Sequence, residues 1–277
     1  MDFTSEIQIF ENYASKIFQG LSVDQKWTDK LYPAMSYSFL GGGKRFRPVL
    51  AMLMMKALKQ DAHKILPAAC AIEMIHTYSL IHDDLPCMDN DDVRRGRPTN
   101  HKVYGETMAL LAGDALLTDA FFVLADQMKD FEKVAALVQL VAEAAGSQGM
   151  VGGQVMDVFL KELNQDLVEK IHRYKTGALI RVSCESAAVL AGLSLENQKK
   201  VRHFGENLGL AFQVKDDLLD FQEESGAVNL AHILGEEKAE DFLQQLSRKA
   251  QQDLAELGIE SENTLFQLIQ WNQKRTL

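Results

Sequence analysis

Apolar residues recur at steps of three and four positions along much of the chain. The most regular run consists of Leu110, Leu111, Ala115, Leu116, Ala120, Phe121 and Leu124. Segments 132–145, 165–192 and 196–220 have the same spacing, which places apolar side chains on one face of an α-helix. No segment shows a convincing alternation of apolar and polar residues. The pattern therefore predicts an all-α protein, a packed bundle of many helices.

Proline and glycine positions divide the chain further. The prolines all lie in the first 98 residues, at Pro33, Pro48, Pro67, Pro86 and Pro98. Because proline breaks helix interiors, the rest of the chain is free to form long helices. Loops are expected at 41–43, 86–98 and 223–229, and the polar segment 236–277 predicts one or two C-terminal helices. No low-complexity linker or repeat interrupts the sequence, so we expect a single domain over residues 1–277.

Composition narrows the class of protein. The 277 residues are 47% hydrophobic and carry a formal net charge of −10, which argues against a nucleic-acid partner. Three cysteines, Cys70, Cys87 and Cys184, form no disulfide framework and fit a reducing compartment. The N-terminus lacks a secretory signal, and the longest uninterrupted apolar stretch, Val49–Met55, is too short to span a bilayer. We expect a cytoplasmic protein without a membrane span.

A stripe of polar residues interrupts the apolar segment 208–221. Gln213, Asp216, Asp217 and Asp220 have offsets of 0, 3, 4 and 7, so they share one helical face. Unpaired carboxylates would be very costly to bury there. The stripe therefore faces either solvent or a polar cavity that holds a cation, and its spacing alone does not decide between them.

A second stripe lies earlier in the chain and shifts this balance. His76, Ser79, Asp83 and Asp84 have offsets of 0, 3, 7 and 8, again on one face of an apolar helix. Pro86 ends or bends this helix, so that Asp89 is expected to turn back toward Asp83. Two acid clusters on two apolar helices favour one shared site.

The ligand chemistry of these clusters points to a hard cation. Carboxylate oxygens suit Mg²⁺, or Mn²⁺, rather than zinc. Mg²⁺ is commonly held by a few carboxylates together with water and substrate phosphates. Two such clusters are therefore suited to hold several Mg²⁺ ions around a diphosphate.

Basic residues accompany the acids. Lys44, Arg45 and Arg47 follow the glycines at 41–43, while the arginines at 94, 95 and 97 follow the first acid cluster. A solvated surface is the ordinary explanation for such runs, but their position beside the acids favours a polyanion site. The lysine after the glycines is not part of a P-loop, because Ser38 and Arg45 stand where that motif needs glycine and Ser or Thr.

At this point a family resemblance can be identified. HDDLPCMDNDDVRRGRPT at 82–99 and FQVKDDLLD at 212–220 resemble the two aspartate-rich motifs of trans-prenyl diphosphate synthases. GGGKRFRP at 41–48, GDALL at 113–117, GGQVMD at 152–157 and YKTG at 174–177 match in the family's order. The resemblance covers residues 35–235 and is greatest to bacterial farnesyl diphosphate synthases. It implies the isoprenoid synthase fold, in which helices surround a central cavity, and usually a homodimer.

The resemblance also implies a reaction and its residues. Isopentenyl diphosphate is joined head to tail (1'-4) to dimethylallyl or geranyl diphosphate, after Mg²⁺-assisted ionisation, to give farnesyl diphosphate. The metal-binding residues would be Asp83, Asp84, Asp89, Asp216, Asp217 and Asp220, with Asp83, Asp89 and Asp216 as the main ligands. The allylic diphosphate would be held by Arg94, Lys175 and Gln213, and isopentenyl diphosphate by Lys44, Arg47, His76 and Arg95. The allylic cation would be stabilised by Lys175, Thr176 and Gln213.

Product length is expected to depend on Tyr78. This residue lies five positions before Asp83, or roughly 7–8 Å along the helix at about 1.5 Å per residue. An aromatic ring there would form a floor for the growing chain, although core packing is the alternative. The two-residue insertion in the first motif resembles that of bacterial farnesyl diphosphate synthases. Together these features predict a fifteen-carbon product.

The chain departs from the family after Asp220. Relatives usually carry a longer loop with lysines there, whereas this chain continues from Phe221 with QEESGAVNLAHILG and has no lysine before Lys238. Three alternatives to farnesyl diphosphate synthesis stay open: a geranylgeranyl or other-length synthase, a terpene cyclase and a non-catalytic synthase-like subunit. Retention of Lys44, Arg47 and Arg95 argues against the cyclase, and the intact acid motifs argue against the non-catalytic subunit.

Overall fold

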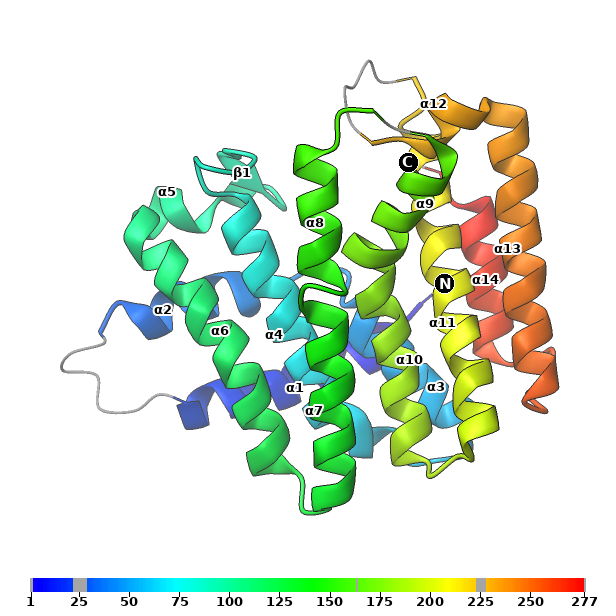
Figure 1. Ribbon diagram of the computed structural model, residues 1–277. Coiled ribbons are helices and arrows are strands. Elements are labelled where there is room, and N and C mark those ends of the chain that lie inside the picture. Colours follow the sequence, from blue (N-terminus) through cyan, green and yellow to red (C-terminus); the bar gives the residue numbers. More distant parts are fainter. Residues whose placement is uncertain (1, 22–28, 163, 223–227, 277) are drawn as a thin grey trace. The chain divides into compact units, whose positions relative to one another are not determined.

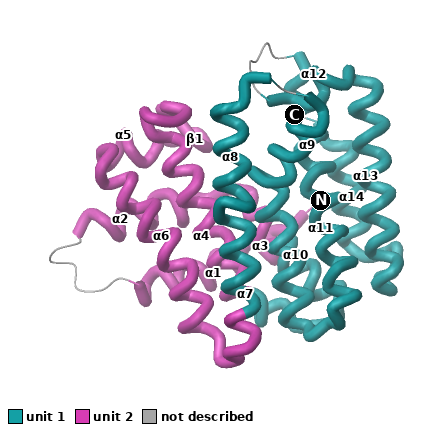
Figure 2. The backbone as a smooth tube through the Cα atoms, viewed as in Figure 1, with its two compact units in different colours: residues 1, 50–65, 136–277 teal, residues 2–49, 66–135 magenta. Residues whose placement is uncertain are grey.

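The computed structural model describes residues 2–21, 29–162, 164–222 and 228–276 and confirms the all-α prediction (Figure 1). The chain divides into two compact units, which Figure 2 shows in different colours. Unit 1 comprises residues 50–65 and 136–277, and unit 2 comprises residues 2–49 and 66–135. The helix α3 (Phe46–Ala57) begins in unit 2 and ends in unit 1, as does α7 (Phe131–Ala145). A single domain over 1–277 stays a prediction.

Unit 2 is built around α4 (Leu66–Asp83), a mostly apolar helix. Its other helices are α1 (Thr4–Leu21), α2 (Leu31–Phe39), α5 (Asn100–Tyr104) and α6 (Glu106–Gln127). Most residues of α4 are buried, as expected of a helix that carries apolar residues around most of its circumference. It packs closely on α6, because Gly113 leaves room for the His82 ring: a Cβ at this glycine would lie 2.0 Å from Nε2 of His82. This packing sets the orientation of the C-terminal end of α4, where the first acid cluster begins.

A short β-hairpin follows this cluster and was not predicted. Strands β1 (Val93–Arg94) and β2 (Arg97–Pro98) pair antiparallel, with Val93 opposite Pro98. The two residues between them, Arg95 and Gly96, have φ values of 54° and 73°, as in the tight turns that favour hairpins. Strands of two residues are too short to show an alternating pattern, which is why the sequence indicated only a loop.

Unit 1 is built around α11 (Leu195–Leu219), which packs against α10 (Ala178–Leu190) and α13 (Glu236–Glu256). Its remaining elements are η1 (Ala62–Ile65), α8 (Met150–Phe159), α9 (Gln165–His172), η2 (Arg173–Gly177), α12 (Leu230–Leu234) and α14 (Thr264–Lys274). The predicted C-terminal helices are α13 and α14. The predicted segment 165–192 is not one regular helix, because η2 adopts π-helical hydrogen bonding between α9 and α10.

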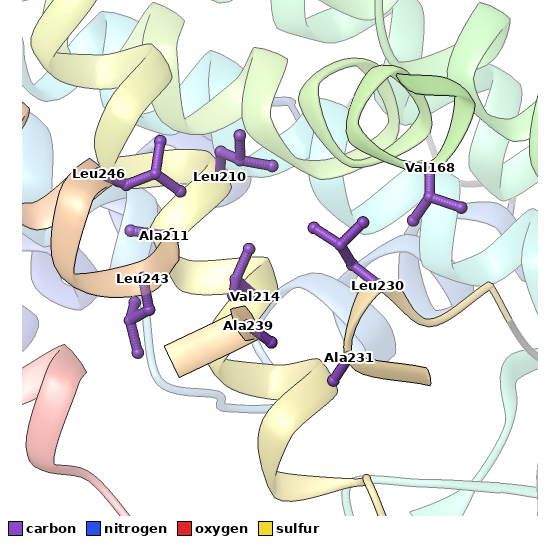
Figure 3. Close-up of a cluster of buried hydrophobic side chains, with 9 residues drawn as sticks. All are labelled: Val168, Leu210, Ala211, Val214, Leu230, Ala231, Ala239, Leu243 and Leu246. Atoms are coloured by element: carbon purple, nitrogen blue, oxygen red, sulfur yellow. The ribbon is translucent and has the colours of Figure 1, made fainter. Parts of the chain in front are cut away.

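A cluster of apolar side chains sets the rotation of α11. Leu210, Ala211 and Val214 point into a core with residues of α9, α12 and α13, namely Val168, Leu230, Ala231, Ala239, Leu243 and Leu246 (Figure 3). Leu210 and Val214 are four residues apart and therefore occupy one face of the helix. With that face buried, the polar stripe that contains Gln213 and Asp216 is turned away from this core.

Two segments are long and apolar enough to cross a membrane by length and composition, Glu106–Gln127 and Phe131–Phe159. The expectation of no span was based on uninterrupted apolar runs, whereas average hydropathy over a window tolerates scattered polar residues. The finding is weak evidence for a span, since core helices of soluble proteins pass the same test. Within unit 2, α6 contacts α4, α2 and α5.

Candidate functional site

The first acid cluster lies where α4 ends. Asp83 is the last residue of the helix, and the chain then folds back so that the N–H of Asp89 donates to the carbonyl of Asp83 at 2.8 Å. The backbone thus turns back at Asp89 toward Asp83, as predicted. Asp83 is half-buried and Asp89 is exposed. These two carboxyl groups begin and end one tight turn of unit 2.

Asp84 has a different environment from its neighbour Asp83. It is 3% exposed, and its Oδ1 accepts a hydrogen bond from Nε of Arg94 at 2.6 Å. Burial raises the pKa of Asp84, while the bond and charge of Arg94 lower it. Arg94 also donates to Asp91 at 3.1 Å. The Asp84 carboxylate is therefore engaged in orienting Arg94 within unit 2.

The Asp84–Arg94 pair lines a small cavity in unit 2. Its volume is about 50 Å³, and its other walls include Tyr37, Thr77 and Asn100. Asn100 is 2% exposed, and its Oδ1 has no hydrogen-bond partner among the described residues. The space accommodates one or two water molecules but no prenyl diphosphate. At this volume the cavity is too small to be a substrate pocket.

The predicted basic residues of unit 2 separate into inward- and outward-facing groups. Arg45 is 2% exposed, with Nη1 at 3.1 Å from Glu73 and Nη2 donating to the carbonyl of Phe39 at 2.8 Å. Lys44, beside it, is exposed and Arg47 is half-buried. Arg45 thus acts as an internal brace, which leaves Lys44 and Arg47 as the residues available for a ligand.

Arg95 is held by the glycine loop. Its Nη1 donates to the carbonyl of Gly42, and a Cβ at Gly43 would lie 2.6 Å from the same nitrogen. Gly43 also has a φ of 136°, which L side chains rarely adopt. Gly43 is therefore required by the close approach of the Arg95 guanidinium group, while Gly42 accepts its hydrogen bond, so this loop brings the two predicted basic segments together.

His76 lies in the field of these arginines. Its pKa is well below the ordinary value of 6.5, because burial and the charges of Arg47, Arg95, Arg94 and Arg45 all disfavour protonation. The ring is therefore neutral near pH 7 and can donate or accept a hydrogen bond. Several arginine charges acting on one buried ring indicate an electropositive region, which is suited to an anion.

Tyr78 is buried at 6% exposure on α4. Its ring meets the His82 ring edge-on, with centroids 5.7 Å apart, and His82 Nε2 lies 3.0 Å from the carbonyl of Leu110 on α6. Burial and the nearby Asp83 raise the pKa of Tyr78 to about 12, so the phenol stays neutral. The ring is rigidly placed below the first acid cluster, and its role in product length stays a prediction.

The second acid cluster lies on α11 in unit 1, and Asp217 is its buried member. Asp217 is 7% exposed, and its Oδ2 accepts from the N–H of Leu230 at 2.6 Å and lies 2.8 Å from Nε2 of His172. Asn229 donates to the carbonyl of Asp217 at 3.1 Å. Asp217 therefore fixes the start of α12 and joins it to α9.

Asp216 and Asp220 are more accessible. Asp220 is exposed at the C-terminal end of α11, where its N–H donates to the carbonyl of Asp216 at 3.0 Å. The side chain of Asp216 is 35% exposed, and Gln213 Nε2 donates to its Oδ2 at 3.0 Å. Its Oδ1 lies 2.6 Å from Nη2 of Arg275. Burial raises the pKa of Asp216, and Arg275 opposes that rise.

Sequence reasoning missed Arg275. The residue follows α14 and is distant in sequence from the acid cluster, and no motif marks it. The predicted loss of the family's basic loop after Asp220 falls partly on residues 223–227, which lie outside the described part of the chain. On either side of that segment, the carbonyl of Phe221 pairs with Nε2 of His232 at 3.0 Å.

Lys175 and Thr176 lie in the π-helical turn η2. Lys175 Nζ forms an ion pair with Oδ2 of Asp157 on α8, a residue within the matched segment 152–157 to which no role was assigned. The α8 backbone approaches closely, since a Cβ at Gly153 would lie 2.2 Å from the backbone nitrogen of Lys175. Single π-helical turns occur frequently at functional sites.

The structure thus divides each aspartate pair in the same way. The first residue of each pair, Asp83 or Asp216, is half-buried, whereas the second, Asp84 or Asp217, is buried and held by an arginine or a histidine. Among the described residues, no group of three or more His, Cys, Asp or Glu is arranged as a cation site. The donors that remain are a few carboxylates, which is the set that Mg²⁺ uses together with water and phosphate oxygens.

Comparison with known proteins gives concordant results. The family model described as polyprenyl synthetase matches residues 28–239. Farnesyl diphosphate synthase of Geobacillus stearothermophilus is 50% identical over 200 residues, covering 70% of this chain and 67% of that protein. Chloroplastic geranylgeranyl pyrophosphate synthase of Catharanthus roseus is 42% identical over 257 residues, covering 86% of this chain and 72% of that protein.

A solved structure is similar over nearly the whole chain. The crystal structure of an FPP/GFPP synthase from Zymomonas mobilis, in its apo form, has a TM-score of 0.88 and 35% sequence identity. The similarity covers 97% of this chain and 99% of that one. The names of these proteins include more than one product, namely farnesyl diphosphate, geranylgeranyl pyrophosphate and FPP/GFPP.

Proposed function

The chain belongs to the polyprenyl synthetase family, the trans-prenyl diphosphate synthases, and we propose that it makes farnesyl diphosphate. Isopentenyl diphosphate is joined head to tail to dimethylallyl or geranyl diphosphate. The observation that carries the proposal is the matched division of the two aspartate pairs, in which one residue faces outward and the other is used internally. The alternative explanation of the stripes was a solvent-exposed helix face. Such a face would leave both aspartates of each pair exposed.

The proposed reaction begins with loss of diphosphate from the allylic substrate. The carbon–oxygen bond breaks, and its electron pair leaves with the diphosphate group. The double bond of isopentenyl diphosphate then forms the new carbon–carbon bond, and a proton is lost to the departing diphosphate. Bound Mg²⁺ would supply the positive charge that stabilises the leaving group. The carboxylates that would hold it are Asp83, Asp89, Asp216 and Asp220.

The buried aspartates have a supporting part in this proposal. Asp84 keeps Arg94 oriented, so that the guanidinium group is available to the allylic diphosphate. Asp217 keeps α11 joined to α9 and α12. We therefore assign both residues to positioning and reserve direct metal contact for the outward carboxylates. Such fixed charges are effective in catalysis because they need no reorganisation during the reaction.

The remaining polar residues supply substrate contacts in this scheme. Lys44, Arg47 and Arg95 bind isopentenyl diphosphate, and neutral His76 contributes a hydrogen bond. Lys175, oriented by Asp157, binds the allylic diphosphate together with Gln213. The carbonyl of Lys175, within the π-helical turn, and Thr176 face the developing allylic cation.

A geranylgeranyl or other-length synthase is the second candidate function. The 42% identity to a chloroplastic geranylgeranyl synthase favours it, while the buried Tyr78 ring favours the shorter product. The test is incubation of the pure protein with Mg²⁺, isopentenyl diphosphate and dimethylallyl or geranyl diphosphate, followed by chromatography of the dephosphorylated alcohols. Farnesol as the main product supports the proposal. If all the alcohols are longer than farnesol, the second candidate replaces the proposal. If no prenyl product forms, a non-catalytic subunit is favoured.

The proposal extends to assembly and location. We propose a cytoplasmic homodimer with Mg²⁺ as cofactor, with neither a nucleic-acid partner nor a membrane span. One face of α8 supports association, because Val151, Val155, Val158 and Phe159 follow helical spacing and are all exposed. Size-exclusion chromatography of the pure protein, followed by light scattering on the eluted peak, measures the oligomeric state directly.

A further inference from the structure

Arg275 is built into the second acid cluster. Besides its contact with Asp216, its Nε donates to Oδ1 of Asn272 at 2.9 Å and its Nη2 donates to the carbonyl of Phe212 at 2.9 Å. The guanidinium carbon lies 4.3 Å from the centroid of the Phe212 ring. The side chain of Arg275 is only 10% exposed. This is a formed binding site for one guanidinium group, in contrast to a loose surface ion pair.

The segment that carries Arg275 is equally well anchored. Asn272 is 2% exposed, and its Nδ2 donates to the carbonyl of Ala211 on α11 at 3.0 Å. The N–H of Arg275 donates to the carbonyl of Trp271 at 2.9 Å, which completes the last turn of α14. The helices α11 and α14 are therefore held together close to the ion pair between Arg275 and Asp216.

The charge balance explains why a cation is needed there. Asp216, Asp217 and Asp220 lie within about one turn of each other, so three like charges are gathered at this end of α11. Between Asp220 and Lys238 the sequence has no lysine or arginine. Arg275 supplies the missing positive charge from another part of unit 1. A charge-assisted bond of 2.6 Å makes this one of the stronger contacts of the cluster.

We propose that Arg275 is a built-in counter-cation that competes with a divalent metal ion for Asp216. Arg275 and Gln213 between them engage both carboxylate oxygens of Asp216. A metal ion that approaches Oδ1 meets the positive guanidinium group at the same oxygen. Binding of the metal to Asp216 therefore requires Arg275 to release it. The inference depends on the proposed metal role of Asp216.

The test compares metal binding by four variants with that of the wild-type chain. Mn²⁺ alone is titrated into metal-free protein, and free Mn²⁺ is measured by electron paramagnetic resonance. Arg275→Gln is expected to lower the Kd for Mn²⁺ by about three- to tenfold, since hydrogen bonds to charged groups are typically worth that much or more. Lys274→Gln is the matched control: it makes the same charge change at an adjacent, exposed residue and should leave the Kd within about twofold.

Asp216→Asn locates the effect. In this background Arg275→Gln is expected to change the Kd for Mn²⁺ no further. An Arg275→Gln variant that binds Mn²⁺ no more tightly than the wild type, while Asp216→Asn weakens binding, overturns the competition and leaves the proposed function standing. If Asp216→Asn does not affect Mn²⁺ binding at all, both the competition and the metal role of Asp216 are wrong.

A measurement on the unaltered chain makes the test independent of variant folding. Hydrogen exchange at the amide of Arg275 reports its bond to Trp271. Release of the side chain should loosen this last turn, so added Mn²⁺ is expected to speed exchange at the Arg275 amide and to leave exchange in the preceding turns of α14 unchanged. Unchanged or slower exchange at Arg275 with Mn²⁺ bound contradicts the inference.

Discussion

Asp217 and Asp220 are both predicted metal residues, and their replacement by alanine should separate two kinds of role. Asp217 is 7% exposed and pairs with the N–H of Leu230 at 2.6 Å and with Nε2 of His172 at 2.8 Å. A carboxylate only accepts, so both partners are donors. In Asp217→Ala these two donors lose their acceptor in a buried setting.

The magnitude follows from these contacts. Leaving a buried donor unsatisfied costs about 1–3 kcal/mol, and two such donors are involved. Removing the buried carboxylate also removes its own desolvation cost, so we expect a net loss of about 3 kcal/mol in the free energy of unfolding. Leu230 belongs to the buried cluster of Figure 3, so its release also loosens the packing of α12. Asp220→Ala, at an exposed position, should change stability by less than about 0.5 kcal/mol.

The assay is urea unfolding of metal-free protein, followed by circular dichroism, together with hydrogen exchange at Leu230. Asp217→Ala should lower the unfolding midpoint and speed exchange at Leu230, whereas Asp220→Ala should do neither and should lower Mg²⁺-dependent turnover. Asp217→Asn is the control, since it keeps the size of the side chain and one acceptor oxygen. Its loss in the free energy of unfolding should be about half that of Asp217→Ala. Equal unfolding midpoints for Asp217→Ala, Asp220→Ala and the wild type would refute the reasoning.

Three further predictions concern unit 2. Asp83→Ala should abolish nearly all prenyl transfer without unfolding the protein, and near-normal turnover in the product assay would contradict a metal role. Tyr78→Ala should shift products beyond fifteen carbons because the ring no longer blocks the growing chain, and unchanged products on chromatography would reject the floor. His76 has a lowered folded pKa, so the unfolded chain binds more protons and stability falls as pH drops through 6.5 toward the folded value. His76→Gln should lessen this decline in urea midpoints, and an unchanged slope would exclude His76 as its source.

Several features of the fold could be predicted because they depend on local spacing. The period of the apolar residues determined the helices, and Pro86 marked the end of α4, where Asp89 turns back to Asp83. The β-hairpin and the π-helical turn could not be predicted in this way. Both are short, and each depends on contacts from other segments, such as the close approach of Gly153 to the backbone of Lys175.

The two aspartate pairs show most clearly what each level of structure decides. The sequence by itself determined that the acids lie on apolar helices and that a hard cation and a diphosphate suit them, since spacing and ligand type are local properties. The spacing alone could not distinguish Asp216 from Asp217, because both lie on the same polar face of the helix, and only the family resemblance named Asp216 as a main ligand. The tertiary structure decided that Asp217 meets Leu230 while Asp216 meets Arg275, a residue that packing alone brings to α11.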